Sequence, residues 1–114
     1  MTKSPLPRLK DILDEINALE ETLSGLSFNE YETSWKIRRA CEHALLIISE
    51  ASRHLPQDIK AKHLHIEWLK IADLGNVLRH EYHHVDDQIV WNIYKKHLPP
   101  LKKAIEAMIE ENNK

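Results

Sequence analysis

Residues 68–91 read WLKIADLGNVLRHEYHHVDDQIVW, and this stretch determines how the rest of the chain is interpreted. Its first part predicts a helix, because apolar residues recur at steps of three or four. The segment 81–85 is expected to lead out of that helix. Asp86 is then predicted to cap the next helix, since a short carboxylate can accept hydrogen bonds from first-turn N–H groups. The apolar stripe of the first helix comprises Trp68, Ile71, Ala72, Gly75, Leu78 and Tyr82.

A polar stripe runs along the other face of the same predicted helix. Its members are Asp73, Asn76, His80 and His83. Arg79 lies at the border of the stripe, one turn beyond Gly75. In an arbitrary helical protein, spacing alone would favour interpreting such a stripe as a solvated face.

The order of residues in this region is more specific than their spacing. The matching positions are Asn76-X-X-X-His80-X-Tyr82, Val85-Asp86, Ile89-Val90-Trp91 and Leu98-Pro99. In this order the chain resembles the HepT-like branch of the HEPN superfamily. The segment 44–51 is also similar to an apolar helix of that family, with Ile48-Ser49-Glu50-Ala51 standing for an Ile-Gly-Glu-Ala type ending. The resemblance implies a small all-α protein. Many members are metal-independent ribonuclease toxins paired with a minimal nucleotidyltransferase antitoxin.

The chain departs from the family pattern at Gly75. The pattern reads Arg-Asn-X-X-X-His-X-Tyr, and its arginine would fall at this position. A glycine inside a helix costs about 1 kcal/mol relative to alanine, so it requires an explanation. The favoured account is close packing against another helix. The other is that Arg79 replaces the family arginine by lying back over this turn, because helix side chains lean toward the N-terminus.

His80, Arg79 and Asn76 are the candidate catalytic residues. Cleavage of RNA without metal needs a base for the 2′-hydroxyl, an acid for the leaving 5′ oxygen and a donor for the phosphate charge. Histidine can perform either proton transfer near neutral pH, and arginine offers a fixed fork of donors to phosphate oxygens. Asn76 lies one turn before His80, where it can orient the ring or the phosphate. The alternative is an exposed His–Arg pair without function.

Tyr82 follows His80 by two residues, and the resemblance implies that the antitoxin attaches AMP to it. That modification would place phosphate charge and bulk beside the catalytic histidine and block RNA. The alternative is a ring packed on the apolar stripe with its hydroxyl outward. In the family the site lies near a subunit interface. We therefore expect a homodimer that brings two copies of the His80 stripe to one cleft.

Length and composition limit the class of protein. A chain of 114 residues and 13.4 kDa predicts a single domain, residues 1–114. A net charge of −2 provides no global basic field for nucleic acid. The single cysteine, Cys41, excludes an internal disulfide. Because neither a signal peptide nor a membrane-spanning stretch is recognisable, a cytoplasmic protein is expected. The histidines lack zinc-site spacing, so no metal or other cofactor is expected.

The remaining segments predict an all-α antiparallel bundle of four to five helices. Turn residues and prolines divide the chain. Tyr31 and Trp35 lie on a broad apolar helix, where they could be core residues or dimer contacts, and the core is the favoured interpretation. Pro99-Pro100 is expected to interrupt the helical pattern. The predicted helices span residues 5–24, 29–54, 66–79, 87–96 and 101–111, with a loop over 55–65 that contains one helical turn around 58–62.

Two functions follow, and Gly75 separates them. The first is a toxin-type RNA endonuclease that leaves a cyclic phosphate and is neutralised by a nucleotidyltransferase. The second is a catalytically impaired binding module that has lost the family arginine and serves as the partner and AMPylation substrate of that nucleotidyltransferase.

Overall fold

A computed structural model describes residues 4–80 and 86–113 of the protein. This part of the chain contains no strand, so the all-α prediction is confirmed. A 3₁₀ turn covers Ala61–His63 and a π-helical turn covers Ile93–His97. The α-helices are α1 (Leu6–Leu23), α2 (Phe28–Glu32), α3 (Trp35–Arg53), α4 (Gln57–Lys60), α5 (Trp68–His80), α6 (Asp87–Asn92) and α7 (Leu98–Asn112).

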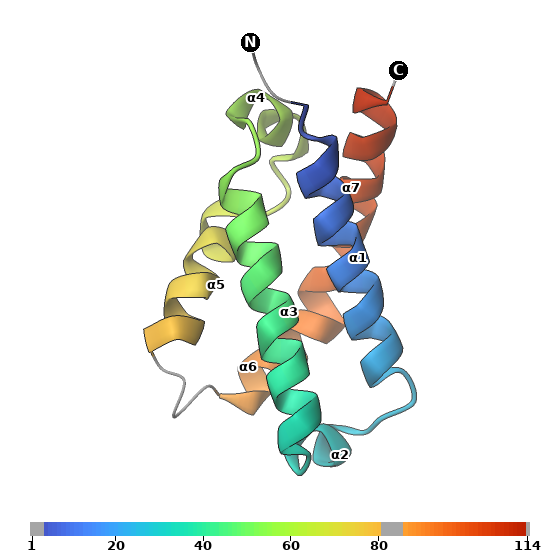
Figure 1. Ribbon diagram of the computed structural model, residues 1–114, viewed down its shortest axis with the longest axis vertical. Helices are drawn as coiled ribbons and strands as arrows, with labels where there is room; N and C mark the ends of the chain where they lie inside the picture. Colours follow the sequence, from blue (N-terminus) through green and yellow to red (C-terminus); the bar gives the residue numbers. More distant parts are fainter. Residues whose placement is uncertain (1–3, 81–85, 114) are drawn as a thin grey trace.

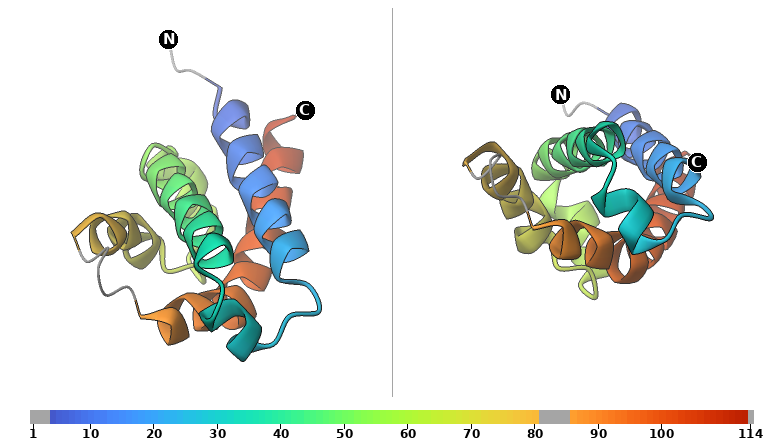
Figure 2. Two further views of the ribbon diagram at one scale, coloured as in Figure 1. Left: turned by 60° about the horizontal axis from the view of Figure 1, so that its bottom comes forward. Right: turned by 90° about the horizontal axis from the view of Figure 1, so that it is seen from below.

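The four long helices α1, α3, α5 and α7 alternate in direction along the chain. Helix α3 packs against α1 on one side and against α5 on the other, and α7 packs against α1 (Figure 1). Viewed from below, α6 lies between α5 and α7, where it leads into the π-helical turn (Figure 2). Helix α5, which carries the candidate residues, is therefore held at the edge of the bundle by α3.

Helix α1 shows how the sequence builds this core. Its apolar residues recur at steps of three or four, and the helix ends before Gly25, which has a φ of 79° that glycine adopts without strain. Removing these side chains from water supplies the main stabilisation of the bundle. The buried residues of α1 are Leu9, Ile12, Ile16, Leu19 and Leu23.

The predicted helix over residues 29–54 is wrong as one continuous element. Helix α2 begins at a capping box, in which the Glu30 backbone N–H donates to Ser27 Oγ at 3.1 Å and the Ser27 N–H donates to Glu30 Oε1 at 2.9 Å. The chain then becomes extended at Ser34, whose side-chain oxygen accepts from the Ile37 N–H at 3.3 Å. Serine side chains compete in this way with the helical backbone, so α3 starts anew at Trp35.

The division at Ser34 also corrects the assignment of one aromatic residue. Tyr31 is fully buried, as predicted, and lies 5.7 Å from the Trp91 ring between centroids. Trp35, however, is 58% exposed, because it begins α3 at the foot of the bundle rather than continuing the buried face of α2. Its only aromatic-face contact among the described residues is with the Arg39 guanidinium, 5.6 Å from the ring centroid.

The expected interruption at Pro99-Pro100 is also wrong. The helical path continues from α6 through the π-helical turn into α7, and the prolines occupy the first turn of α7. A proline there loses little, because first-turn N–H groups have no partner inside the helix. The wider π-helical turn directly before it accommodates the two rings, whose clash with preceding carbonyls would strain an ordinary helix.

Candidate functional site

Asn76 lies on α5 with its side chain exposed, as the polar stripe predicts. Its Nδ2 donates to Asp73 Oδ1 at 3.3 Å, and Asp73 is exposed as well. Pairing residues three apart is a local stabilisation that a helix surface commonly shows. The described half of the predicted stripe is therefore solvent-facing, which a site for a macromolecular substrate requires.

Arg79 and His80 are the last two residues of α5, so His80 follows Asn76 by one helical turn. The side chains of Arg79 and His80 lie outside the described part of the structure, and Tyr82 falls in the segment 81–85, which is also outside it. Their assignment as catalytic and modified residues therefore stays a prediction.

Gly75 is buried against α3, and one side chain explains it. The Gly75 N–H donates to Ser49 Oγ at 2.8 Å, and Ser49 Oγ donates to the Ala72 carbonyl oxygen at 3.1 Å. Ser49 is completely buried, so its hydroxyl sits between the two helices and bonds to the backbone of α5. A close approach of this kind favours a small residue at position 75. The packing account of this glycine is supported.

Sequence reasoning missed the role of Ser49. A polar residue at a buried position of a helix needs hydrogen-bond partners, and a lone serine in the apolar run 44–51 was the available signal. Its partner could not be read from the sequence, because Gly75 lies 26 residues farther along the chain.

Asp86 caps α6, as predicted. Its Oδ1 accepts from the Gln88 N–H at 2.8 Å, and its backbone is extended before the helix begins. Asp86 directly follows the segment 81–85 that carries Tyr82, so the cap marks where the described structure resumes after that segment.

A polar cluster lies where α2, α3 and α6 meet, and it consists of the buried Tyr31 and the partly buried Arg38 and Asp87. Arg38 Nη1 is 3.9 Å from Asp87 Oδ2, whereas Tyr31 Oη, Arg38 Nε and Asp87 Oδ1 have no hydrogen-bond partner within the described residues. Burial, with Cys41, Asp87 and Glu42 adding to it, raises the pKa of Tyr31 far above its usual range, so the phenol stays protonated. This cluster could not be predicted from the sequence, because Asp87 is distant from Tyr31 and Arg38 along the chain.

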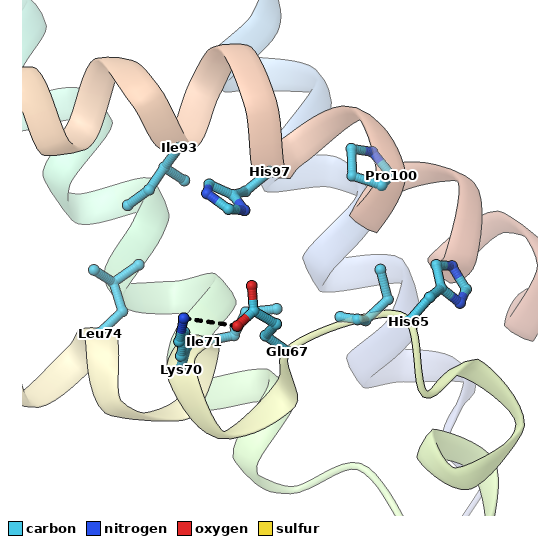
Figure 3. A pocket seen from close by; sticks show the side chains of 9 residues that line it. His65, Glu67, Lys70, Ile71, Leu74, Ile93, His97 and Pro100 are labelled. Atoms are coloured by element: carbon cyan, nitrogen blue, oxygen red, sulfur yellow. Dashed lines mark ion pairs between the residues drawn. The ribbon is translucent and has the colours of Figure 1, made fainter.

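A pocket with a volume of about 240 Å³ lies between α5 and the π-helical turn. Figure 3 shows Ile71 and Leu74 of α5 facing Ile93 and His97 of the π-helical turn. The pair Glu67–Lys70 lies at the mouth, with Lys70 Nζ 2.7 Å from Glu67 Oε2. This pocket was not predicted from the sequence, because one of its walls is a π-helical turn that the apolar spacing does not indicate.

Within residues 4–80 and 86–113, no group of three or more His, Cys, Asp or Glu side chains is placed to hold a metal ion. None of the helices in that same part of the chain combines the length and apolar character needed to cross a membrane.

Comparison with known proteins identifies the family. The family described as Ribonuclease HepT-like matches residues 12–108. A protein of Caldanaerobacter subterraneus, provisionally named as an RNase, is 34% identical over 96% of this chain and 97% of its own. A probable ribonuclease HepT of Thermococcus cleftensis is 33% identical over 95% of this chain and 98% of its own. No solved structure gives a significant match. The chain therefore belongs to the Ribonuclease HepT-like family of HEPN-type ribonucleases.

Proposed function

We propose that this chain is a metal-independent RNA endonuclease of the toxin type, neutralised by a minimal nucleotidyltransferase antitoxin. The observation that carries the proposal is family membership over residues 12–108. The two relatives described above are named as ribonucleases, and the match covers nearly their whole length. The exposed Asn76 on α5, one turn before His80, agrees with the stripe on which the proposed chemistry depends.

The proposed reaction is attack of a ribose 2′-hydroxyl on the adjacent phosphorus. One histidine removes the 2′-hydroxyl proton while the new O–P bond forms, and an acid protonates the 5′ oxygen as its P–O bond breaks. The products end in a 2′,3′-cyclic phosphate and a 5′-hydroxyl. We assign His80 to proton transfer and Arg79 to the charge that develops on the phosphate oxygens. In a homodimer, two copies of His80 supply the base and the acid.

The test is cleavage of single-stranded RNA by the purified chain, followed by analysis of the product ends. We expect cyclic phosphate ends, no effect of EDTA, and a loss of about 10²–10⁴ in rate for His80→Ala. Arg79→Ala should lose about 3–4 kcal/mol of transition-state stabilisation if it resembles removal of an oxyanion donor. His43→Ala is the matched control, because His43 is an exposed histidine on α3. Full activity of His80→Ala would refute the proposal.

A second function is favoured by one observation at Gly75. The family arginine would stand at a position that is buried and hydrogen-bonded to Ser49 at 2.8 Å, so this chain carries no cation there. The corresponding proposal is a catalytically impaired module that a nucleotidyltransferase binds and modifies on Tyr82. In that step the tyrosine oxygen attacks the α-phosphorus of ATP, and pyrophosphate leaves.

Mass spectrometry separates the two functions. Incubation with the cognate nucleotidyltransferase and ATP should add one AMP to Tyr82 in both cases, whereas RNA cleavage before modification occurs only in the first. Tyr82→Phe is the control that should abolish the addition. AMP found on another residue, with Tyr82 unmodified, would refute the assignment of the modification site.

A further inference from the structure

The pocket beside α5 has two helical walls, α5 and the π-helical turn, whose side chains leave a space between them. Helix α5 bonds through the backbone of Ala72 and Gly75 to Ser49 of α3. Its Ile71 and Leu74 side chains face Ile93 of the π-helical turn across the pocket, and all three remain only partly buried (Figure 3). Apolar side chains left in a concave site favour a ligand with an apolar surface.

The size of the space limits that ligand. A cavity of about 240 Å³ lies below the range of about 300–1,000 Å³ that drug-sized ligands occupy, so it suits a single planar ring system. The imidazoles of His65 and His97 also border the pocket (Figure 3). Histidine rings are among the side chains on which unstacked bases lie in RNA complexes.

The mouth of the pocket presents an acceptor and a donor side by side. The Glu67 carboxylate accepts and the Lys70 ammonium donates, 2.7 Å apart. The hydrogen bond and charge of Lys70, with a smaller effect of His97, lower the pKa of Glu67, so the carboxylate remains an acceptor at neutral pH. The Watson–Crick edge of every nucleobase carries a donor next to an acceptor, which is the complementary pattern.

We infer that this pocket binds one unpaired base of an RNA strand, with its ring between Ile71, Leu74 and Ile93 and its edge on Glu67 and Lys70. This inference rests on the proposed ribonuclease function and defines its substrate as single-stranded RNA. Lys70 precedes Asn76 by six residues on α5, which is about 9 Å along the helix axis. A base held in the pocket therefore anchors the strand close to the candidate catalytic end of the same helix.

The test uses nucleosides, so that binding is measured without cleavage. Methyl NMR spectra of the chain are recorded with adenosine, cytidine, guanosine or uridine at concentrations up to several times ~1 mM, so that a Kd on the order of 1 mM is detected. We expect the methyl signals of Ile71, Leu74 and Ile93 to shift for at least one nucleoside and not for ribose 5-phosphate. Leu74→Trp should fill the pocket and abolish the shifts. Absence of shifts with all four nucleosides would overturn the inference.

A second pair of variants tests recognition without filling the cavity. Glu67→Lys combined with Lys70→Glu keeps an ion pair at the start of α5 but exchanges donor and acceptor, so the nucleoside affinities should change at least severalfold relative to one another. Glu20→Lys combined with Lys102→Glu is the matched control, because that pair, 2.9 Å apart, links α1 to α7 away from the pocket. Unchanged relative affinities in the first double variant would overturn the inference.

The outcome also distinguishes this inference from the proposed function. Nucleoside binding without RNA cleavage would leave the pocket assigned and refute the ribonuclease proposal. RNA cleavage that is unaffected by Leu74→Trp, with no nucleoside shifts, would refute the pocket alone. Shifts of the three methyl signals that appear only with the nucleotidyltransferase, and not with nucleosides, would assign the surface to a protein partner and overturn the inference.

Discussion

Replacing Gly75 by arginine restores the family residue, and the structure predicts that this change destabilises the protein. Position 75 is buried, and its N–H donates to the completely buried Ser49 Oγ at 2.8 Å. A side chain added to such a contact forces the helices apart, and overpacking of this kind costs about 1–3 kcal/mol. Separating α3 from α5 also weakens the hydrogen bonds of the buried Ser49 hydroxyl, which costs about 1 kcal/mol. The better helix propensity of arginine offsets less than about 1 kcal/mol of this loss.

The net expectation for Gly75→Arg is a loss of about 1–3 kcal/mol in the free energy of unfolding. Ser49→Gly removes the hydroxyl that occupies the contact, so the same arginine should cost less in that background. The four proteins of this double-mutant cycle, compared by urea unfolding at 25 °C, should give a favourable coupling energy of about 1–2 kcal/mol.

Two results would refute the reasoning. One is a Gly75→Arg protein as stable as the wild type while Ser49 is present. The other is additivity, with no coupling between positions 49 and 75. RNA cleavage by the same four proteins adds a functional result: activity that appears only in the Ser49→Gly, Gly75→Arg protein would favour the impaired-module function for the natural chain.

Other regions of the molecule give independent predictions. Tyr31→Phe should leave stability unchanged or raise it by about 1 kcal/mol in urea unfolding, because the buried hydroxyl has no hydrogen-bond partner among the described residues; a loss above about 2 kcal/mol would contradict this. Burial raises the pKa of Cys41 to about 11, above its ordinary 9.0, so the folded state holds the thiol proton more tightly. The corresponding stability, up to about 2–3 kcal/mol, should be present below pH 9 and lost as the pH rises toward 11; a Cys41→Ala protein with the same pH profile as the wild type would contradict the assignment. Light scattering should report a dimer of the 13.4 kDa chain at micromolar concentration, and a monomer would contradict the shared-cleft arrangement.

The sequence was informative wherever structure depends on near neighbours. The apolar spacing of α1, the cap at Asp86 and the solvated face at Asn76 all follow from residues within one or two turns. Prediction failed at Ser34, where one hydroxyl competes with the helical backbone and divides an otherwise continuous apolar pattern.

The missed parts of the site depend on contacts between distant residues. Ser49 meets Gly75 across 26 positions, and Arg38 meets Asp87 across 49, so neither pairing leaves a local pattern. The pocket depends on the π-helical turn at Ile93–His97, and helix propensities do not distinguish a π-helical turn from an ordinary one. The proposed roles of Arg79, His80 and Tyr82 come from order and resemblance, and the variants above are their test.

The π-helical turn at Ile93–His97 also sets the phase between two apolar faces. Val90 of α6 and Leu98 of α7 are both buried, yet eight residues of regular helix would place them about 80° apart around the axis. A π-helical turn holds about one extra residue, which subtracts about 100° and brings the two side chains to within about 20°. Deleting one residue from this turn would therefore rotate α7 against α6, so that Val90 and Leu98 could no longer face the same core.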